Sequence, residues 1–144
     1  MDKDGWAYLA GLVDADGTIA VNRWIDKRYQ RHRYTARLSV ANCDKDIMDW
    51  LAARLGGSVC LSNKNAPKHH RTLWRWSVCG MQAKPLLEKL LPHLKIKQKR
   101  AELALQFIAT IGVAGGPLLS PEVMERREQI FKHITRMNQR GRLR

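Results

Sequence analysis

The most regular pattern in the chain is an alternation of apolar and polar residues over 33–42, which is typical of a half-buried strand. Residues 18–24 form a second strand-like run, and the polar stretch 26–31 between them predicts the turn of a hairpin. The runs 58–62 and 72–79 predict a second hairpin. Each hairpin would have one apolar face and one polar face. The polar face would carry Asn22, Arg33, Thr35, Arg37, Ser39 and Arg75.

Apolar residues at helical spacing predict one helix before each hairpin and three helices after the second. Asp2 or Asp4 can cap the first helix, and Gly17 suits a sharp exit from it. The order predicts an α+β fold in which helices cover one face of a four-stranded antiparallel sheet and the polar face stays open. We expect a single domain over 1–144, with a core at about 1–95 and C-terminal helices at about 96–144. The helices are expected at residues 6–13, 44–55, 85–91, 97–111 and 120–137.

Charge is distributed unevenly along this pattern. The chain has 144 residues and a formal net charge of +13, and the blocks 23–39 and 64–84 each contribute +5, whereas 1–22 has a net charge of −3. A protein this basic repels itself unless a polyanion binds it, so nucleic acid is the first partner to consider. No apolar run is long enough for a membrane span, and a polar strand face argues against a membrane surface as the partner. No phosphate-cradling glycine-rich loop is present, and we expect no organic cofactor.

The cysteines bear on the compartment. There are three of them, no pair has CxxC spacing, and a disulfide framework is therefore not expected. We expect buried or half-buried thiols and an intracellular, reducing location, such as the cytoplasm of a bacterium or phage host or the interior of an organelle.

The stretch 9–17, Leu-Ala-Gly-Leu-Val-Asp-Ala-Asp-Gly, combines small residues with two acids at the end of the first predicted helix. The small residues are Ala7, Ala10 and Gly11, and their helical spacing would let a second copy of this helix approach closely. Asp14 and Asp16 of two such copies would lie near a common axis, where like charges require a cation between them. Oxygen ligands of this kind suit Mg²⁺. Taken alone, the acids and Gly17 are more typical of a helix-ending turn; the residues 9–12 before them and the basic chain around them favour the metal site.

This stretch resembles the LAGLIDADG motif of homing endonucleases, with Val13 in place of isoleucine. The segment 94–99, Leu-Lys-Ile-Lys-Gln-Lys, is similar to the basic segment that follows the core sheet in the single-motif, homodimeric members. The resemblance implies an αββαββα core whose sheet forms a DNA-binding saddle. It also implies intron homing by a homodimer that hydrolyses both strands of a long pseudo-palindromic double-stranded DNA target, with Mg²⁺ or another divalent cation such as Mn²⁺ or Ca²⁺ at the same site.

The resemblance also implies roles for single residues. Asp16 would be the metal ligand, joined by the backbone carbonyl of Ala15, and Asp14 would tie the turn to the partner subunit. Lys97 would lie near the scissile phosphate, and Asn42 would help to order the waters around it. Two alternatives stay open: Lys97 could neutralise a helix end or a distant phosphate, and Asn42 could be a strand-end or turn residue.

A two-stranded ribbon fits the major groove of B-DNA, so the polar strand face is the expected reading surface. Arginines there can reach guanine edges or phosphates, and the loop of the second hairpin would grip the backbone. The expected DNA-binding residues are Asn22, Trp24, Arg33, Thr35, Arg37, Ser39, Ser62, Lys64, Lys68, Arg71, Arg75 and Ser77. The alternative function is a non-cleaving DNA-binding regulator or an RNA-splicing maturase on the same fold. The retention of both Asp14 and Asp16 favours a nuclease over a regulator, although a maturase can also keep the two acids.

Overall fold

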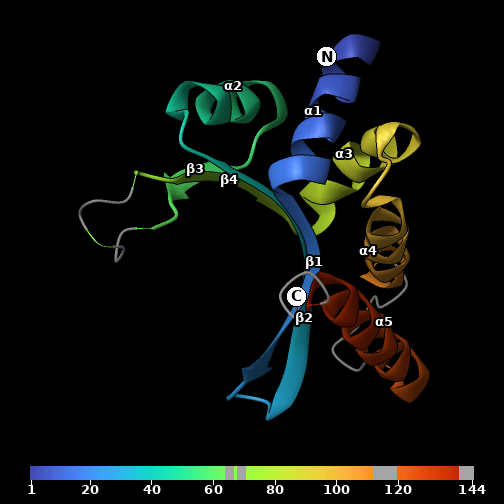
Figure 1. Cartoon of the computed structure of the whole chain (residues 1–144). Coiled ribbons are helices and arrows are strands. Elements are labelled where there is room, and N and C mark those ends of the chain that lie inside the picture. The colour runs from blue at the N-terminus through green and yellow to red at the C-terminus, as the bar shows by residue number, and fades with distance from the viewer. Residues whose placement is uncertain (64–66, 68–70, 112–119, 140–144) are drawn as a thin grey trace.

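A four-stranded antiparallel sheet with strand order β1-β2-β4-β3 forms the centre of the molecule (Figure 1). The computed structural model describes residues 1–63, 67, 71–111 and 120–139. Both predicted hairpins are confirmed, and β2 and β4 join them through an antiparallel register from Arg37↔Cys79 to Asn42↔Trp74. The strands are β1 (Gly17–Asp26), β2 (Arg31–Asn42), β3 (Ser58–Leu61) and β4 (Trp74–Cys79).

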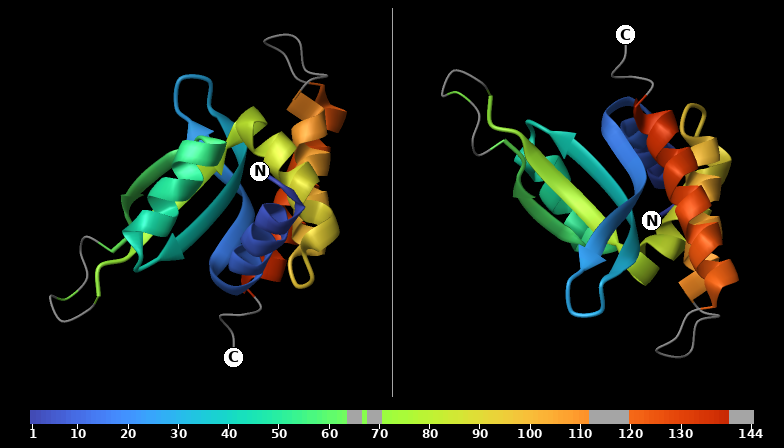
Figure 2. Two further views of the ribbon diagram at one scale, coloured as in Figure 1. Left: turned by 90° about the horizontal axis from the view of Figure 1, so that it is seen from above. Right: turned by 90° about the horizontal axis from the view of Figure 1, so that it is seen from below.

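The helices lie on one side of the curved sheet and leave its other side open (Figures 1 and 2). The order of elements confirms the predicted α+β arrangement. Within the described residues, no helix has the length and apolar character needed to cross a bilayer. The helices are α1 (Lys3–Asp16), α2 (Lys45–Leu55), α3 (Ala83–Leu90), α4 (Gln98–Ile111) and α5 (Pro121–Gln139), with the short 3₁₀ turns η1 (Gly80–Gln82) and η2 (Leu91–His93).

Local chemistry explains where the first two helices begin and end. Asp2, rather than Asp4, caps α1, since its Oδ1 accepts a hydrogen bond from Gly5 N at 2.9 Å. Asp44 caps α2 in the same way, through Asp46 N and Ile47 N. Gly56 ends α2 with a φ of 78°, a left-handed conformation that favours glycine.

The hydrophobic core lies between the sheet and the helices. Alternate strand residues supply one side of it, and α1, α3 and α4 supply much of the other. Trp76 is fully buried, and its Nε1 donates to Gly56 O at 2.8 Å, which satisfies its one polar group. The strand residues buried in this core are Ile19, Val21, Ala36, Leu38, Val40, Trp76 and Val78.

Helix α5 covers the free edge of β1. Asn138 Nδ2 donates to Ile19 O at 3.1 Å, and Arg23 and Tyr34 both bind the Glu128 carboxylate. Burial and the hydrogen bond to Glu128 raise the pKa of Tyr34 to about 12, so its hydroxyl stays protonated and donates. The Asn138 contact satisfies a backbone carbonyl at an edge that would otherwise be open to another strand.

Candidate functional site

The carboxyl end of α1 places two acids in different environments. The Asp14 carboxylate accepts hydrogen bonds from Lys95 N at 2.8 Å and Lys97 N at 3.0 Å, at the amino end of α4. A negative group is favourable at that position because the amino end of a helix carries partial positive charge. Asp16, the last residue of α1, is exposed. Asp14 therefore joins two segments of its own chain, whereas Asp16 faces solvent.

The Lys97 side chain completes this junction from the other direction. Its Nζ donates to Val13 O at 2.7 Å and Asp14 O at 2.9 Å, in the last turn of α1. Val13 O also accepts from Gly17 N, whereas Asp14 O is among the carbonyls that a helix end leaves without an intrahelical partner. Burial and the nearby Arg100 lower the pKa of Lys97, against the opposing effect of the Asp14 and Asp16 carboxylates. The sequence left two roles open for Lys97, one near the scissile phosphate and one at a helix end. These contacts show that it neutralises the carboxyl end of α1. They also hold its charge next to the acids.

Gly17 is required here for a steric reason that differs from the one expected. Its φ is −96°, so it does not use the left-handed conformation of a glycine cap. A Cβ at this position would lie 2.7 Å from Val13 Cα and 3.0 Å from Ser39 O. Glycine thus lets α1 and β2 approach closely enough to bring Asp16 to the edge of the sheet.

The donor set at this end fits a hard divalent cation. Asp16 offers a carboxylate, and Ala15 offers a carbonyl at a helix end, where intrahelical partners are lacking; both are oxygen ligands of the kind that Mg²⁺ binds. Among the residues that the structure describes, no group of three or more His, Cys, Asp or Glu side chains could hold a metal ion.

Asn42 lies at the same end of the sheet, because Gly17 pairs with Val40. Its Oδ1 accepts a hydrogen bond from Asp44 N at 2.9 Å, just before α2. The turn role considered for Asn42 is therefore documented by a contact, and its role in ordering waters remains a prediction.

The open face of the sheet brings together most of the predicted reading residues. Strand alternation puts Asn22 and Trp24 of β1 beside Arg33, Thr35 and Arg37 of β2, because the register runs unbroken from Gly17↔Val40 to Asp26↔Arg31. Arg75 of β4 follows opposite Ala41. The face is therefore basic and polar across three neighbouring strands.

Two predicted contact residues do not reach the surface of that face. Ser39 and Ser77 are only 5% and 8% exposed, and they are cross-strand neighbours. Arg37 Nη2 donates to Ser77 Oγ at 3.2 Å, so this serine supports an arginine from below. The burial of both serines corrects the prediction that they contact DNA directly.

The remaining predicted contacts belong to the second hairpin. Ser62 lies just beyond β3, and its backbone N donates to Leu73 O at 2.7 Å, so it extends the pairing of the hairpin. Arg71 is exposed, and its carbonyl accepts from Asn63 Nδ2. Lys64 and Lys68 lie outside the described residues.

The exposed face of α1 contains fewer small residues than the sequence predicted. Ala7 and Gly11 are exposed, and a Cβ at Gly11 would meet nothing within 4 Å. Ala10 is 1% exposed and packs in the core of its own chain, so it is removed from the proposed contact between subunits. Both carboxylate oxygens of Asp14 bind backbone N–H groups of the same chain, and its contact with a partner subunit stays a prediction.

Sequence reasoning missed three features of the open face. Cys60 and Cys79 are exposed on this face, where they pair across the strands with Arg75 and Arg37. Cys43 is exposed as well, so the expectation of buried or half-buried thiols is corrected for all three cysteines. The alternation of the predicted strands could have located Cys60 and Cys79. A groove at the β1 edge brings side chains of α5 next to this face, and no local pattern predicts a contact so distant in sequence. The groove is lined by Thr18, Ala20, Val21, Asn22, Arg23, Arg37, Phe131, Thr135, Asn138 and Gln139.

Solved structures of homing endonucleases have the same fold. I-CvuI, in complex with its target in the presence of calcium, matches with a TM-score of 0.77 and 26% identity over 92% of this chain and 81% of that chain. The archaeal intron-encoded I-Vdi141I, complexed with DNA, matches with a TM-score of 0.77 and 14% identity over 94% of this chain and 85% of that one. The LAGLIDADG homing endonuclease I-LtrWI, bound to target DNA, matches with a TM-score of 0.71 and 14% identity over 91% of this chain and 43% of that one.

No protein-family model and no curated protein sequence matches the chain. The structural matches nevertheless define the class, because they extend over nearly its whole length. The chain has the fold of the LAGLIDADG homing endonucleases. With one motif at residues 9–17 and a match over 81% of I-CvuI, it resembles the single-motif type.

The two acids of the motif should differ in their effect on stability. We expect Asp14→Ala to lower the free energy of unfolding by roughly 1–3 kcal/mol, since it leaves Lys95 N and Lys97 N without their acceptor. Asp16→Ala, at an exposed position, should change it by less than about 0.5 kcal/mol. Urea denaturation at one fixed protein concentration measures both. An equal loss for the two variants would contradict the assignment of Asp14 as the structural acid.

Proposed function

We propose that this chain is a site-specific DNA endonuclease that acts as a homodimer on a long pseudo-palindromic duplex and hydrolyses both strands with a divalent cation. The observation that carries the proposal is the exposed Asp16 carboxylate at the end of α1, at the edge of a basic open sheet face. A protein that only binds DNA gains nothing from a carboxylate facing phosphate, because the two repel each other.

The exposed part of α1 supports the homodimer. Ala7 and Gly11 are one helical turn apart and leave open space where a second α1 could lie. Two copies related by a two-fold axis through this contact would bring their Asp16 residues toward each other. In such a dimer the two open sheet faces are related by the two-fold axis, so the two half-sites of the DNA target must be related by the same symmetry.

The residues around Asp16 have complementary roles in the proposed reaction. Asp16 and the Ala15 carbonyl would hold Mg²⁺, which when bound supplies positive charge at the cleaved phosphate and activates water. Lys97 is fixed by the carbonyls of Val13 and Asp14, so its charge is already in place when negative charge develops at phosphorus. The arginines of the open face position the duplex against this end of α1.

The test is cleavage of a randomised palindromic duplex library by the full chain, with Mg²⁺ or with EDTA, followed by sequencing of the cut ends. We expect cuts that require Mg²⁺ and enrich one pseudo-palindromic sequence. Tight, sequence-specific binding without cleavage would replace the enzyme by a regulator. Binding of a structured RNA in preference to duplex DNA would favour a maturase.

A further inference from the structure

An acidic residue interrupts the basic open face near the end of the first hairpin. Residues 23–39 contain six basic side chains and one acid, Asp26. The β1–β2 register continues without a break to Asp26↔Arg31, so alternation puts Asp26 on the same face as Asn22 and Trp24. A carboxylate at this position repels a DNA phosphate. On a face that binds DNA, we therefore expect a neighbouring cation to neutralise its charge.

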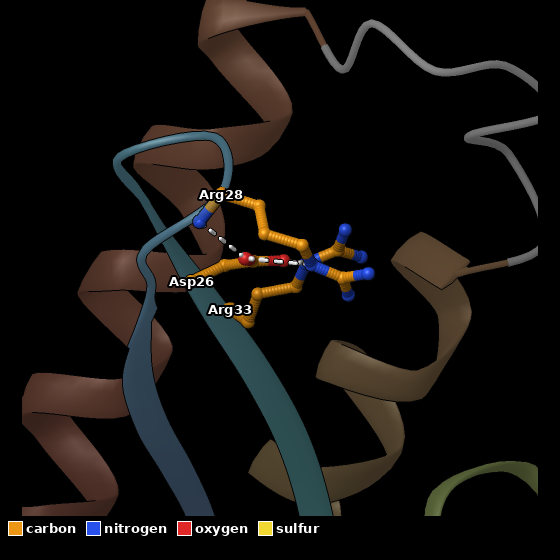
Figure 3. Close-up of polar contacts among 3 residues, drawn as sticks. All are labelled: Asp26, Arg28 and Arg33. Atoms are coloured by element: carbon orange, nitrogen blue, oxygen red, sulfur yellow. Dashed lines mark hydrogen bonds and ion pairs between the residues drawn. The ribbon is translucent and has the colours of Figure 1, made fainter.

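Two arginines surround this carboxylate (Figure 3). Asp26 Oδ2 accepts from Arg33 Nε at 3.0 Å, and Oδ1 accepts from Arg28 N at 3.1 Å and lies 3.7 Å from Arg28 Nε. The Asp26 side chain is only 10% exposed, whereas those of Arg33 and Arg28 are 41% and 83% exposed. In Figure 3 the arginine side chains converge on the carboxylate, and their terminal nitrogens extend beyond it.

This geometry fixes one end of the Arg33 guanidinium and leaves the other end free to bind a ligand. Nε is committed to Asp26, and the terminal nitrogens keep the planar fork that matches guanine O6 and N7. Burial opposes ionisation of Asp26, but the hydrogen bonds from Arg28 and Arg33 and the charges of both outweigh it and lower its pKa. The anchor therefore stays ionised at neutral pH, and an arginine held in this way loses less conformational freedom on binding.

We propose that Asp26 is a positioning residue for sequence recognition, which holds Arg33 in the orientation that reads a guanine in the part of each half-site facing the hairpin end. This inference rests on the proposed function, since it presumes that the open face binds duplex DNA. Arg28, with its exposed side chain and its backbone N bound to Asp26, contacts phosphate beside that base pair. Asp26 itself touches no DNA.

The test compares sequence profiles of binding, obtained by selecting a randomised duplex with Ca²⁺ in place of Mg²⁺. We expect the wild type to prefer guanine at one position of each half-site and Asp26→Asn to reduce that preference roughly tenfold. Preferences elsewhere should stay unchanged, and affinity for unrelated DNA should stay equal or rise, because a negative charge has been removed. Glu88→Gln is the matched control: it removes the same charge from an ion-paired acid on α3 and should leave the whole profile unchanged.

Variants of the arginine separate positioning from a general effect. Arg33→Lys keeps the charge but loses the fork, and it should lose the same guanine preference. In an Arg33→Ala background, Asp26→Asn should have no further effect at that position. A uniform change at all positions, or an equal effect of Asp26→Asn with and without Arg33, would overturn the inference. If the wild type shows no preferred sequence at all, the proposed function itself fails and this inference fails with it.

Discussion

Asp16→Asn is expected to reduce DNA cleavage by roughly 10²- to 10³-fold or more, while sequence-specific binding persists. The substitution keeps the shape of the side chain but removes the negative charge that would hold the cation beside the scissile phosphate. Asp16 is exposed at the helix end, so the fold should not depend on it. Single-turnover cleavage of the selected target in Mg²⁺ and a binding titration in Ca²⁺ measure the two properties separately.

Lys97→Met provides a comparison for this result. It removes the charge held by Val13 O and Asp14 O, and we expect slower cleavage together with a less stable helix junction. Asp16→Asn should affect cleavage without loss of stability. If Asp16→Asn cleaves at the wild-type rate, the metal site has been assigned to the wrong residue, whatever the binding titration gives.

Gly11→Leu is expected to convert the dimer into monomers, with a dimer dissociation constant raised by at least about a hundredfold, the effect of roughly 3 kcal/mol. A Cβ at Gly11 meets nothing within 4 Å inside one chain, so the monomer can accept the new side chain. Leucine also has a higher helix propensity than glycine, by somewhat under 1 kcal/mol. The side chain would instead occupy the space that we assign to the second α1. Sedimentation velocity over a range of concentrations gives the result.

Ala53→Leu is the matched control for this substitution, because it adds leucine at an exposed position of a different helix, α2. It should leave the assembly unchanged. If Gly11→Leu remains a dimer, the subunits contact each other through a surface other than the one assigned on α1. Loss of cleavage with an intact dimer would indicate that α1 contacts the partner less closely than proposed.

Most of the fold could be predicted from local sequence. The alternation over 33–42 sets which side chains of β2 enter the core, because successive strand residues point to opposite faces. Asp44 and Gly56 define the ends of α2 through a cap and a left-handed glycine, both of which depend on a few neighbouring residues. The strand ends differ by one or two residues from those expected, since hydrogen bonding between strands decides them.

The site could be predicted only in part. The motif at 9–17 located Asp14 and Asp16, and the basic segment 94–99 located Lys97. Their separate roles depend on contacts between residues 14 and 95–97, which are distant in sequence. The spacing of Ala10 gives it the appearance of an interface residue, yet it is buried. Helical spacing identifies a stripe of small residues without saying which of them the rest of the chain covers.

The sequence by itself therefore determined the α+β class, the sheet face that stays polar and the position of the acidic motif, because each follows from the periodicity of neighbouring side chains. Only the tertiary structure decided that Asp14 is used within the chain, that Asp16 is left exposed and that Asp26 anchors Arg33. These properties depend on which groups satisfy the charges and hydrogen bonds of one another. That pairing is set when distant segments pack together.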